Sequence, residues 1–191
     1  MNSTISPSTT KGWFNEKGKD YDVVLSTRVR LSRNIAGYRF PGMMAADEEA
    51  GVQDKILSAF SRLSGDNKLR TINLNDLEPT ERRMLLERNL LTQNYTLQTQ
   101  RAILLNEIQT VTALINEIDH LRVACFHGGL ALEETYEQVD ELDTELDSYL
   151  EYAVSLDWGY INTELTNIGT GMRTSVMLHL PALVETALID R

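Results

Sequence analysis

The sequence contains one cysteine, Cys125, among its 191 residues. A single cysteine cannot form an internal disulfide, so the chain must fold without a covalent cross-link, which suits a reducing compartment. Long hydrophobic stretches are also missing. No segment approaches the roughly 18 apolar residues that span a bilayer, and the polar N-terminus lacks the apolar centre of a signal peptide. We therefore expect a cytoplasmic protein with no membrane association.

Positive charge is scarce as well, with 18 Lys and Arg against 28 Asp and Glu and a net charge of −10. Nucleic acids and anionic membranes are bound through broadly basic surfaces, so the composition argues against both partners. Any phosphate that the protein binds must be held by a local group of arginines. The apolar fraction of 42% is ordinary for a globular protein, and the length suffices for one sizeable domain.

Secondary-structure patterns predict an α+β fold in which helices flank an antiparallel sheet. Residues 1–11 are rich in Ser and Thr, and we interpret them as a disordered tail that precedes one domain over residues 12–191. Apolar periodicity predicts helices over residues 45–63, 79–91 and 132–154. Alternating or β-branched runs predict strands over residues 23–34, 69–74, 102–106, 111–115, 121–126 and 172–180, and residues 157–161 are expected to return the chain to the sheet.

The helix expected over residues 132–154 carries apolar and acidic side chains at helical spacing. Its expected buried stripe consists of Leu132, Tyr136, Val139, Leu142, Leu146, Tyr149, Leu150 and Ala153. The acidic residues are Glu133, Glu134, Asp140, Glu141, Asp143, Glu145, Asp147 and Glu151. Because they lack the alternating ligands of a calcium loop, they predict a solvated face and no metal site.

Three arginine-bearing stretches share a chemistry that suits an anion. Arg28 and Arg30 are spaced by two, which places both guanidinium groups on one face of an extended chain. Two like charges side by side repel unless an anion lies between them, although an exposed edge strand would also tolerate them. Arg173 follows Gly169 and Gly171, glycines that would allow either close approach to a ligand or a plain tight turn before a core strand.

The third stretch contains Asp119, His120 and Arg122. Asp119 and His120 could form an acid–base pair, but at a hairpin they are more often the hydrogen-bonded residues of a turn.

These stretches together resemble the signature segments of the ATP:guanido phosphotransferase (phosphagen kinase) family, and most closely its bacterial protein-arginine kinases. The resemblance rests on residues 26–34 (STRVRLSRN), 116–122 (NEIDHLR) and 166–176 (TNIGTGMRTSV). It implies a glutamine-synthetase/guanido-kinase-like catalytic domain, incomplete at its C-terminal end. It also implies that Arg28, Arg30, Arg122 and Arg173 hold the phosphates of ATP, while Mg²⁺ is held by phosphate oxygens and water.

The acceptor half of the site departs from the family pattern. Family members have Asn-Glu-Glu-Asp-His, and their second glutamate grips the guanidinium acceptor; here Ile118 takes that place. Glu117 remains, but on an extended segment it would point to the opposite face. Glu164 and Leu165 replace the usual Cys-Pro, and Glu164 offers a carboxylate that could partly serve the acceptor.

Three hypotheses follow. We favour a catalytically impaired homologue, in effect a pseudoenzyme, that binds nucleotide and acts as a regulatory or partner subunit. The chain could instead be an active protein-arginine phosphotransferase completed by a missing segment or a partner chain, or a non-enzymatic interaction module. Because residues 172–180 would leave an open strand edge, we also expect self-association, ahead of a dedicated partner protein.

Overall fold

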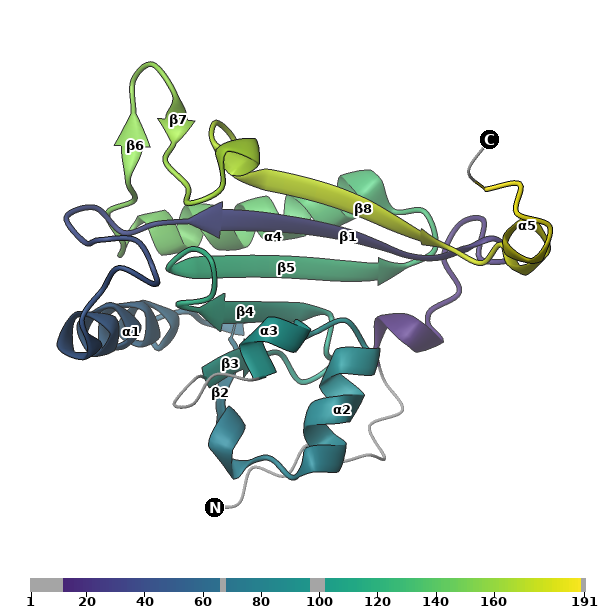
Figure 1. Cartoon of the computed structure of the whole chain (residues 1–191), viewed down its shortest axis with the longest axis horizontal. Coiled ribbons are helices and arrows are strands. Elements are labelled where there is room, and N and C mark those ends of the chain that lie inside the picture. The colour runs from purple at the N-terminus through teal and green to yellow at the C-terminus, as the bar shows by residue number, and fades with distance from the viewer. Residues whose placement is uncertain (1–11, 66–67, 97–101, 190–191) are drawn as a thin grey trace.

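The computed structural model describes residues 12–65, 68–96 and 102–189, so the tail expected over residues 1–11 lies outside the described part. The architecture is a six-stranded antiparallel sheet with the strand order β2-β3-β4-β5-β1-β8, flanked by helices as expected (Figure 1). Its strands are β1 (Val24–Arg33), β2 (Arg70–Asn73), β3 (Ala102–Leu105), β4 (Val111–Ile115), β5 (Leu121–Gly128) and β8 (Met172–Leu178). Strands β3, β4 and β5 form the predicted meander.

Each face of the sheet packs against its own set of helices. Helices α1 (Ala46–Phe60) and α4 (Leu132–Asp147) cover one face, where Val29 and Leu31 of β1 join their apolar side chains. Helices α2 (Pro79–Glu87) and α3 (Gln93–Thr96) cover the other face near β3 and β4, together with the short 3₁₀ helix η1 (Trp13–Asn15). In Figure 1, α4 lies behind the strands and α2 and α3 lie in front.

Local chemistry accounts for the helix starts. Helix α2 begins at Pro79, and the side chain of Glu81 accepts a hydrogen bond from the Glu78 amide in a capping box. Helix α1 carries Asp47, Glu48 and Glu49 in its first turn, where acidic groups suit the helix dipole.

All three predicted helices end earlier than the periodicity predicts. Helix α1 stops at Phe60 rather than at residue 63. Helix α2 stops at Glu87 rather than at residue 91, since Asn89 takes a left-handed φ of 58° that no α-helix can accommodate. Helix α4 stops at Asp147 rather than at Val154. The residues that follow bond instead to the segment just after β1, with the Ala153 amide donating to the Asn34 carbonyl at 2.7 Å.

Helix α4 and the residues after it bury only part of the predicted stripe: Val139, Leu142, Leu146 and Leu150 are buried as expected. Leu132, Tyr136 and Tyr149 are exposed, whereas Asp143, expected on the solvated face, is only 6% exposed. The reason is a buried partner on β1: the guanidinium of Arg33 lies 2.6 Å from the Asp143 carboxylate. A carboxylate can be buried in this way only when its charge is compensated.

The region between α4 and β8 does not rejoin the main sheet. Strands β6 (Val154–Ser155) and β7 (Gly159–Tyr160) pair with each other in a separate two-stranded sheet, so the expectation for residues 157–161 is wrong. In Figure 1 this hairpin stands away from the six-stranded sheet. A second 3₁₀ helix, η3 (Leu74–Asp76), follows β2, and η4 (Leu165–Asn167) follows β7.

Strand β8 forms an edge of the sheet among the described residues. It pairs with β1 alone, and none of its residues is buried, so the alternative of a tight turn before a core strand is wrong. Helix α5 (Pro181–Glu185) follows it and likewise contains no buried residue. The expectation of an open edge with exposed apolar side chains is confirmed for this part of the chain.

Candidate functional site

The four candidate arginines lie on one face of the sheet. Three pairs of facing residues on neighbouring strands establish this: Arg30 with Arg173, Arg28 with Ser175, and Ser32 with Arg122. Facing residues in a sheet project to the same side, and residues two apart on one strand do so too. The predicted shared face is confirmed. Because β1 lies between β5 and β8, the alternative of an exposed edge strand is wrong for Arg28 and Arg30.

Positive charge accumulates on this face. Burial, followed by the charges of Arg122 and Arg173, lowers the pKa of Arg28, and the same causes, with Arg28 added, lower the pKa of Arg30. Arginine stays protonated despite such shifts. The Nε of Arg30 is buried and has no hydrogen-bond partner among the described residues. A buried donor next to several cations is an arrangement that an anion would satisfy.

Glu117 supplies negative charge within the cluster. Its carboxylate forms an ion pair with the guanidinium of Arg122 and accepts a hydrogen bond from the hydroxyl of Thr92. Glu117 would point away only on an extended segment, and the segment is not extended: Asn116 has a φ of 54°, and the Glu117 carboxylate reaches Arg122 on β5. Burial lowers the pKa of Arg122, and the charge of Glu117 opposes that change.

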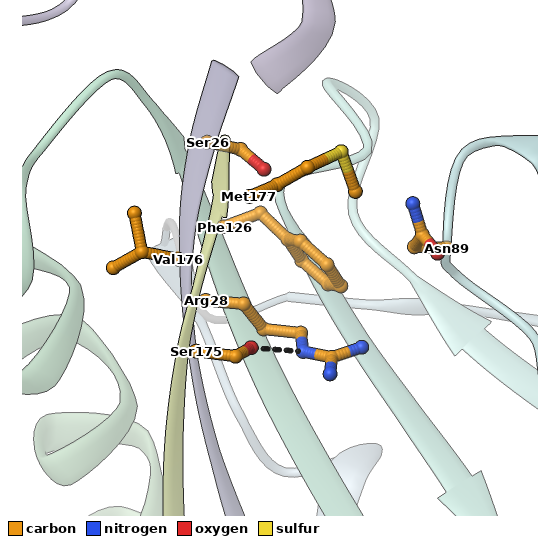
Figure 2. Close-up of a pocket in the computed structure, with 7 residues that line it drawn as sticks. All are labelled: Ser26, Arg28, Asn89, Phe126, Ser175, Val176 and Met177. Carbon is orange, nitrogen blue, oxygen red and sulfur yellow. Dashed lines mark hydrogen bonds between the residues drawn. The ribbon is translucent and has the colours of Figure 1, made fainter. Parts of the chain in front are cut away.

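A cavity of about 250 Å³ adjoins the arginines on the same face. Figure 2 shows Arg28, Phe126 and Met177 projecting towards it from three strands, with Asn89 across the opening. The Nε of Arg28 donates to Ser175 Oγ at 3.1 Å, which fixes the direction of the guanidinium. The cavity therefore combines an apolar wall with a cationic end.

A smaller hollow beside this cavity brings three of the arginines together. Its lining includes Arg28, Arg30 and Arg122, with Thr92 and Asn89 from the segment after α2. The segment after α2 was not singled out from the sequence, because no local pattern links Thr92 to Glu117 across 25 positions.

Position 118, where the family resemblance implies a carboxylate for the acceptor, is occupied by isoleucine. Ile118 is 39% exposed, and its carbonyl accepts a hydrogen bond from the hydroxyl of Thr163. Glu164 is exposed and accepts from the side-chain amide of Asn167 at 3.2 Å. No ion pair between Glu164 and an arginine is found in the described part of the chain.

Asp119 and His120 are the structural residues of a turn. Asp119 accepts hydrogen bonds from the side chain of Asn34 and from the Thr163 amide. His120 accepts from the Ile35 amide through Nδ1 and donates to the Arg39 carbonyl through Nε2, so the ring is neutral. Burial is the main cause that lowers the pKa of His120. With both nitrogens engaged, His120 is not free to act as a general base.

The residues Ile168–Gly171, here called the glycine loop, are fastened to β1 and β7. Gly169 and Gly171 have φ angles of 110° and 63°, a region that favours glycine. The Gly171 carbonyl accepts from the Ser32 amide at 2.8 Å, and a Cβ on Gly171 would lie 2.5 Å from the Ser32 carbonyl oxygen. Close packing against β1 thus requires glycine at position 171.

Cysteine and clustered metal-binding side chains were also considered as ligands. Cys125 lies in the apolar core, where burial raises the pKa of its thiol to about 12. Within residues 12–65, 68–96 and 102–189, no three His, Cys, Asp or Glu side chains gather closely enough to hold a metal ion. No helix in the same ranges is both long and apolar enough to cross a membrane.

Comparison with known proteins identifies the family. Residues 51–191 match the model of the ATP:guanido phosphotransferase C-terminal catalytic domain. The chain belongs to this family. Strand β1, with Arg28 and Arg30, precedes the matched range, but it lies inside the same sheet.

Relatives extend the similarity to the rest of the chain. The chain is 38% identical to a protein-arginine kinase of Geobacillus kaustophilus, over 94% of this chain and 50% of that protein. It is 36% identical to one from Bacillus cereus, over 100% of this chain and 53% of that protein. The chain thus spans about half the length of these curated relatives.

Solved structures share the fold. The duplicated taurocyamine kinase of Schistosoma mansoni with bound transition state analog components superimposes with a TM-score of 0.79 at 27% identity, covering 94% of this chain and 26% of that one. Lombricine kinase gives a TM-score of 0.73 at 25% identity, covering 93% and 53%.

We predict that Gly171→Ala destabilises the protein more than Gly37→Ala. Both glycines have positive φ, which costs an alanine about 1 to 2 kcal/mol. Only at position 171 would the new methyl group collide with backbone, and overpacking adds about 1 to 3 kcal/mol. Urea denaturation of the two variants measures the difference, and equal losses of stability would contradict the close approach of the loop to β1.

Proposed function

We propose that the chain binds ATP on the arginine-bearing face of its sheet, as a guanidino-kinase-like domain of the protein-arginine kinase type. The observation that carries the proposal is the convergence of Arg28, Arg30, Arg122 and Arg173, with a buried unpaired donor on Arg30, beside an open cavity. Such a group of like charges is unfavourable in a folded protein unless a polyanion compensates it. A nucleotide triphosphate is an anion of suitable charge.

The orientation of the nucleotide follows from the two ends of the site. The phosphates would lie at the arginines, which donate charge-assisted hydrogen bonds to phosphate oxygens. The base would enter the cavity between Phe126 and Met177, where an aromatic ring and a thioether offer apolar contact. Mg²⁺ would be held by the phosphates and water, because the described residues provide no protein cage for it.

The same arginines suit phosphoryl transfer. Transfer of a γ-phosphoryl group depends on positioning and on positive charge where negative charge accumulates. The curated relatives are named protein-arginine kinases, which supports a guanidino group of a protein as the acceptor. An arginine acceptor has a very high pKa and needs a carboxylate to orient it and accept its proton.

Among the residues that the structure describes, the site lacks a carboxylate that is free to bind the acceptor. Ile118 can neither orient nor deprotonate an acceptor, and Glu117 is engaged by Arg122 and Thr92. Glu164 remains a candidate whose geometry does not favour it, because its side chain is turned to Asn167. We therefore propose weak or absent transfer by this chain and a nucleotide-binding or regulatory role, in the cytoplasm.

Two alternatives differ from this proposal in measurable ways. An active protein-arginine phosphotransferase completed by a further segment or a partner chain would transfer phosphate once completed. A pure interaction module would not bind nucleotide at all. The buried unpaired donor of Arg30 favours binding over the second alternative.

We predict that Arg122→Ala weakens ATP binding at least several-fold. A hydrogen bond to a charged group contributes about 1.5 to 3 kcal/mol, which corresponds to a factor of about 10 or more. Isothermal titration calorimetry measures the affinity. Arg83→Ala is the matched control, because Arg83 is an exposed arginine on α2 that pairs with Glu87.

Removal of Arg122 leaves the Glu117 carboxylate without its ion pair, so the same comparison is repeated in a Glu117→Gln background. Unchanged affinity in both backgrounds would refute the assignment of Arg122. Absence of binding by the parent protein would favour the interaction module.

We predict that the 191-residue chain transfers little or no phosphate to arginine, free or within an unfolded protein. The reason is the missing carboxylate at position 118. Radiolabelled ATP measures transfer, and turnover in the usual kinase range of about 1 to 100 s⁻¹ would contradict the prediction. We expect that Ile118→Glu alone does not restore turnover; a large gain would show that this position is the sole deficit.

We predict that the chain self-associates through the region of β8 and α5. Open strand edges and exposed apolar side chains tend to be covered, and Leu178 is 48% exposed. Sedimentation velocity at low micromolar concentration should show a species larger than the 21.6 kDa monomer. Leu178→Lys should reduce association, whereas Leu132→Lys on α4, where the leucine is 45% exposed, should not. A monomeric parent protein would contradict the prediction.

A further inference from the structure

We propose that Arg33 is a positioning residue for the nucleotide site: it holds the glycine loop and thereby sets the place of Arg173. This inference rests on the proposed nucleotide binding. Arg33 ends the same strand that carries Arg28 and Arg30, yet it is only 3% exposed. Its burial separates it from the four arginines that we assign to phosphate.

One side of the Arg33 guanidinium faces the glycine loop. Nη1 donates to the Thr170 carbonyl and to the Ser32 carbonyl, each at 2.9 Å. The amide of Ser32 donates in turn to the Gly171 carbonyl at 2.8 Å. Two consecutive carbonyls of the loop are thus fastened to the end of β1. A Cβ on Gly171 would lie 2.6 Å from Nη1, so glycine is what permits this approach.

The other side of the guanidinium is locked by α4 and β7. Nη2 and Nε donate to Asp143 Oδ2 at 2.6 and 3.1 Å. The ring of Tyr160 covers the face of the guanidinium at 3.6 Å from its centroid. All three nitrogens of Arg33 are therefore engaged by the protein, which leaves none to bind a ligand.

This anchorage matters because pairing with β1 holds the backbone of β8, while the preceding glycine loop sets where Arg173 enters that pairing. Arg173 lies two residues after the glycine loop on β8, an edge strand whose residues are mostly exposed. Its facing residue across β1 is Arg30, a like charge that repels it. Without the Arg33 anchor, repulsion would move Arg173 away from the site, and misplacement by about 1 Å weakens the interactions of a preorganised group.

The test compares nucleotide affinity in a double-mutant cycle of Arg33→Lys and Arg173→Ala. Lysine keeps the positive charge beside Asp143 but lacks the fork that also reaches the Thr170 carbonyl. We expect Arg33→Lys to weaken ATP binding about 3- to 10-fold in the parent, and less than about twofold when Arg173 is already alanine, as expected for coupled residues. The same change in an Arg122→Ala background should keep its full effect.

The other possible results of the cycle would contradict either the anchoring role of Arg33 or the proposed nucleotide binding. An equal effect of Arg33→Lys with and without Arg173 would show that Arg33 does not act through Arg173, and no effect in the parent would overturn the anchoring role. If instead neither Arg122→Ala nor Arg173→Ala changes the affinity, the proposed function itself fails, and this inference fails with it.

Thermal denaturation and hydrogen–deuterium exchange distinguish a loss of anchoring from a general loss of stability. Affinities are compared only at temperatures where thermal denaturation shows each variant to be folded. Asp143→Asn provides a second variant, which weakens the contacts of Arg33 while retaining Arg33 itself. Hydrogen–deuterium exchange should rise in residues 168–173 of either variant but stay unchanged in β4 and β5. A uniform rise over the whole sheet would indicate a general loss of stability and would overturn the specific anchoring role.

Discussion

The alternation of side chains along β1 is the constraint on which the rest of the structure depends. Val29 and Leu31 enter the core beneath α1 and α4, so Arg28 and Arg30 must project from the opposite face. Because β5 and β8 flank this strand, their own outward residues extend the cationic row. The same strand therefore supplies residues to the core and to the candidate site, so a change in its register would alter both.

Two buried carboxylates keep this concentration of positive charge compatible with folding, and they do so differently. Glu117 pairs with Arg122 inside the site, where it offsets part of the charge that lowers the pKa of Arg30. Asp143 pairs with Arg33 outside the site, and burial raises the pKa of its carboxyl while the Arg33 charge opposes that rise. The first pair leaves a net positive surface for an anion, and the second fastens the surrounding backbone.

In the candidate site the four arginines share one face of the sheet, whereas the region proposed to bind the acceptor has no carboxylate at position 118. The arginines proposed to bind phosphate lie on β1, β5 and β8, and the loop that precedes Arg173 is anchored to β1. The proposed acceptor region contains an exposed Ile118 and an exposed Glu164 whose side chain is turned towards Asn167. This asymmetry is the basis of our proposal that the chain binds nucleotide but transfers phosphate weakly or not at all.

The α+β class, the meander of β3 to β5 and the shared face of Arg28 and Arg30 follow from the sequence by itself, because local periodicity sets which side chains share a face. The resemblance of the arginine segments correctly indicated the family. Only the tertiary structure decided that Asp143 is buried, that Glu117 turns into the site, and that residues 157–161 leave the main sheet. These outcomes depend on partners distant in the chain, such as Arg33 for Asp143, whose burial and charge compensation no local pattern encodes.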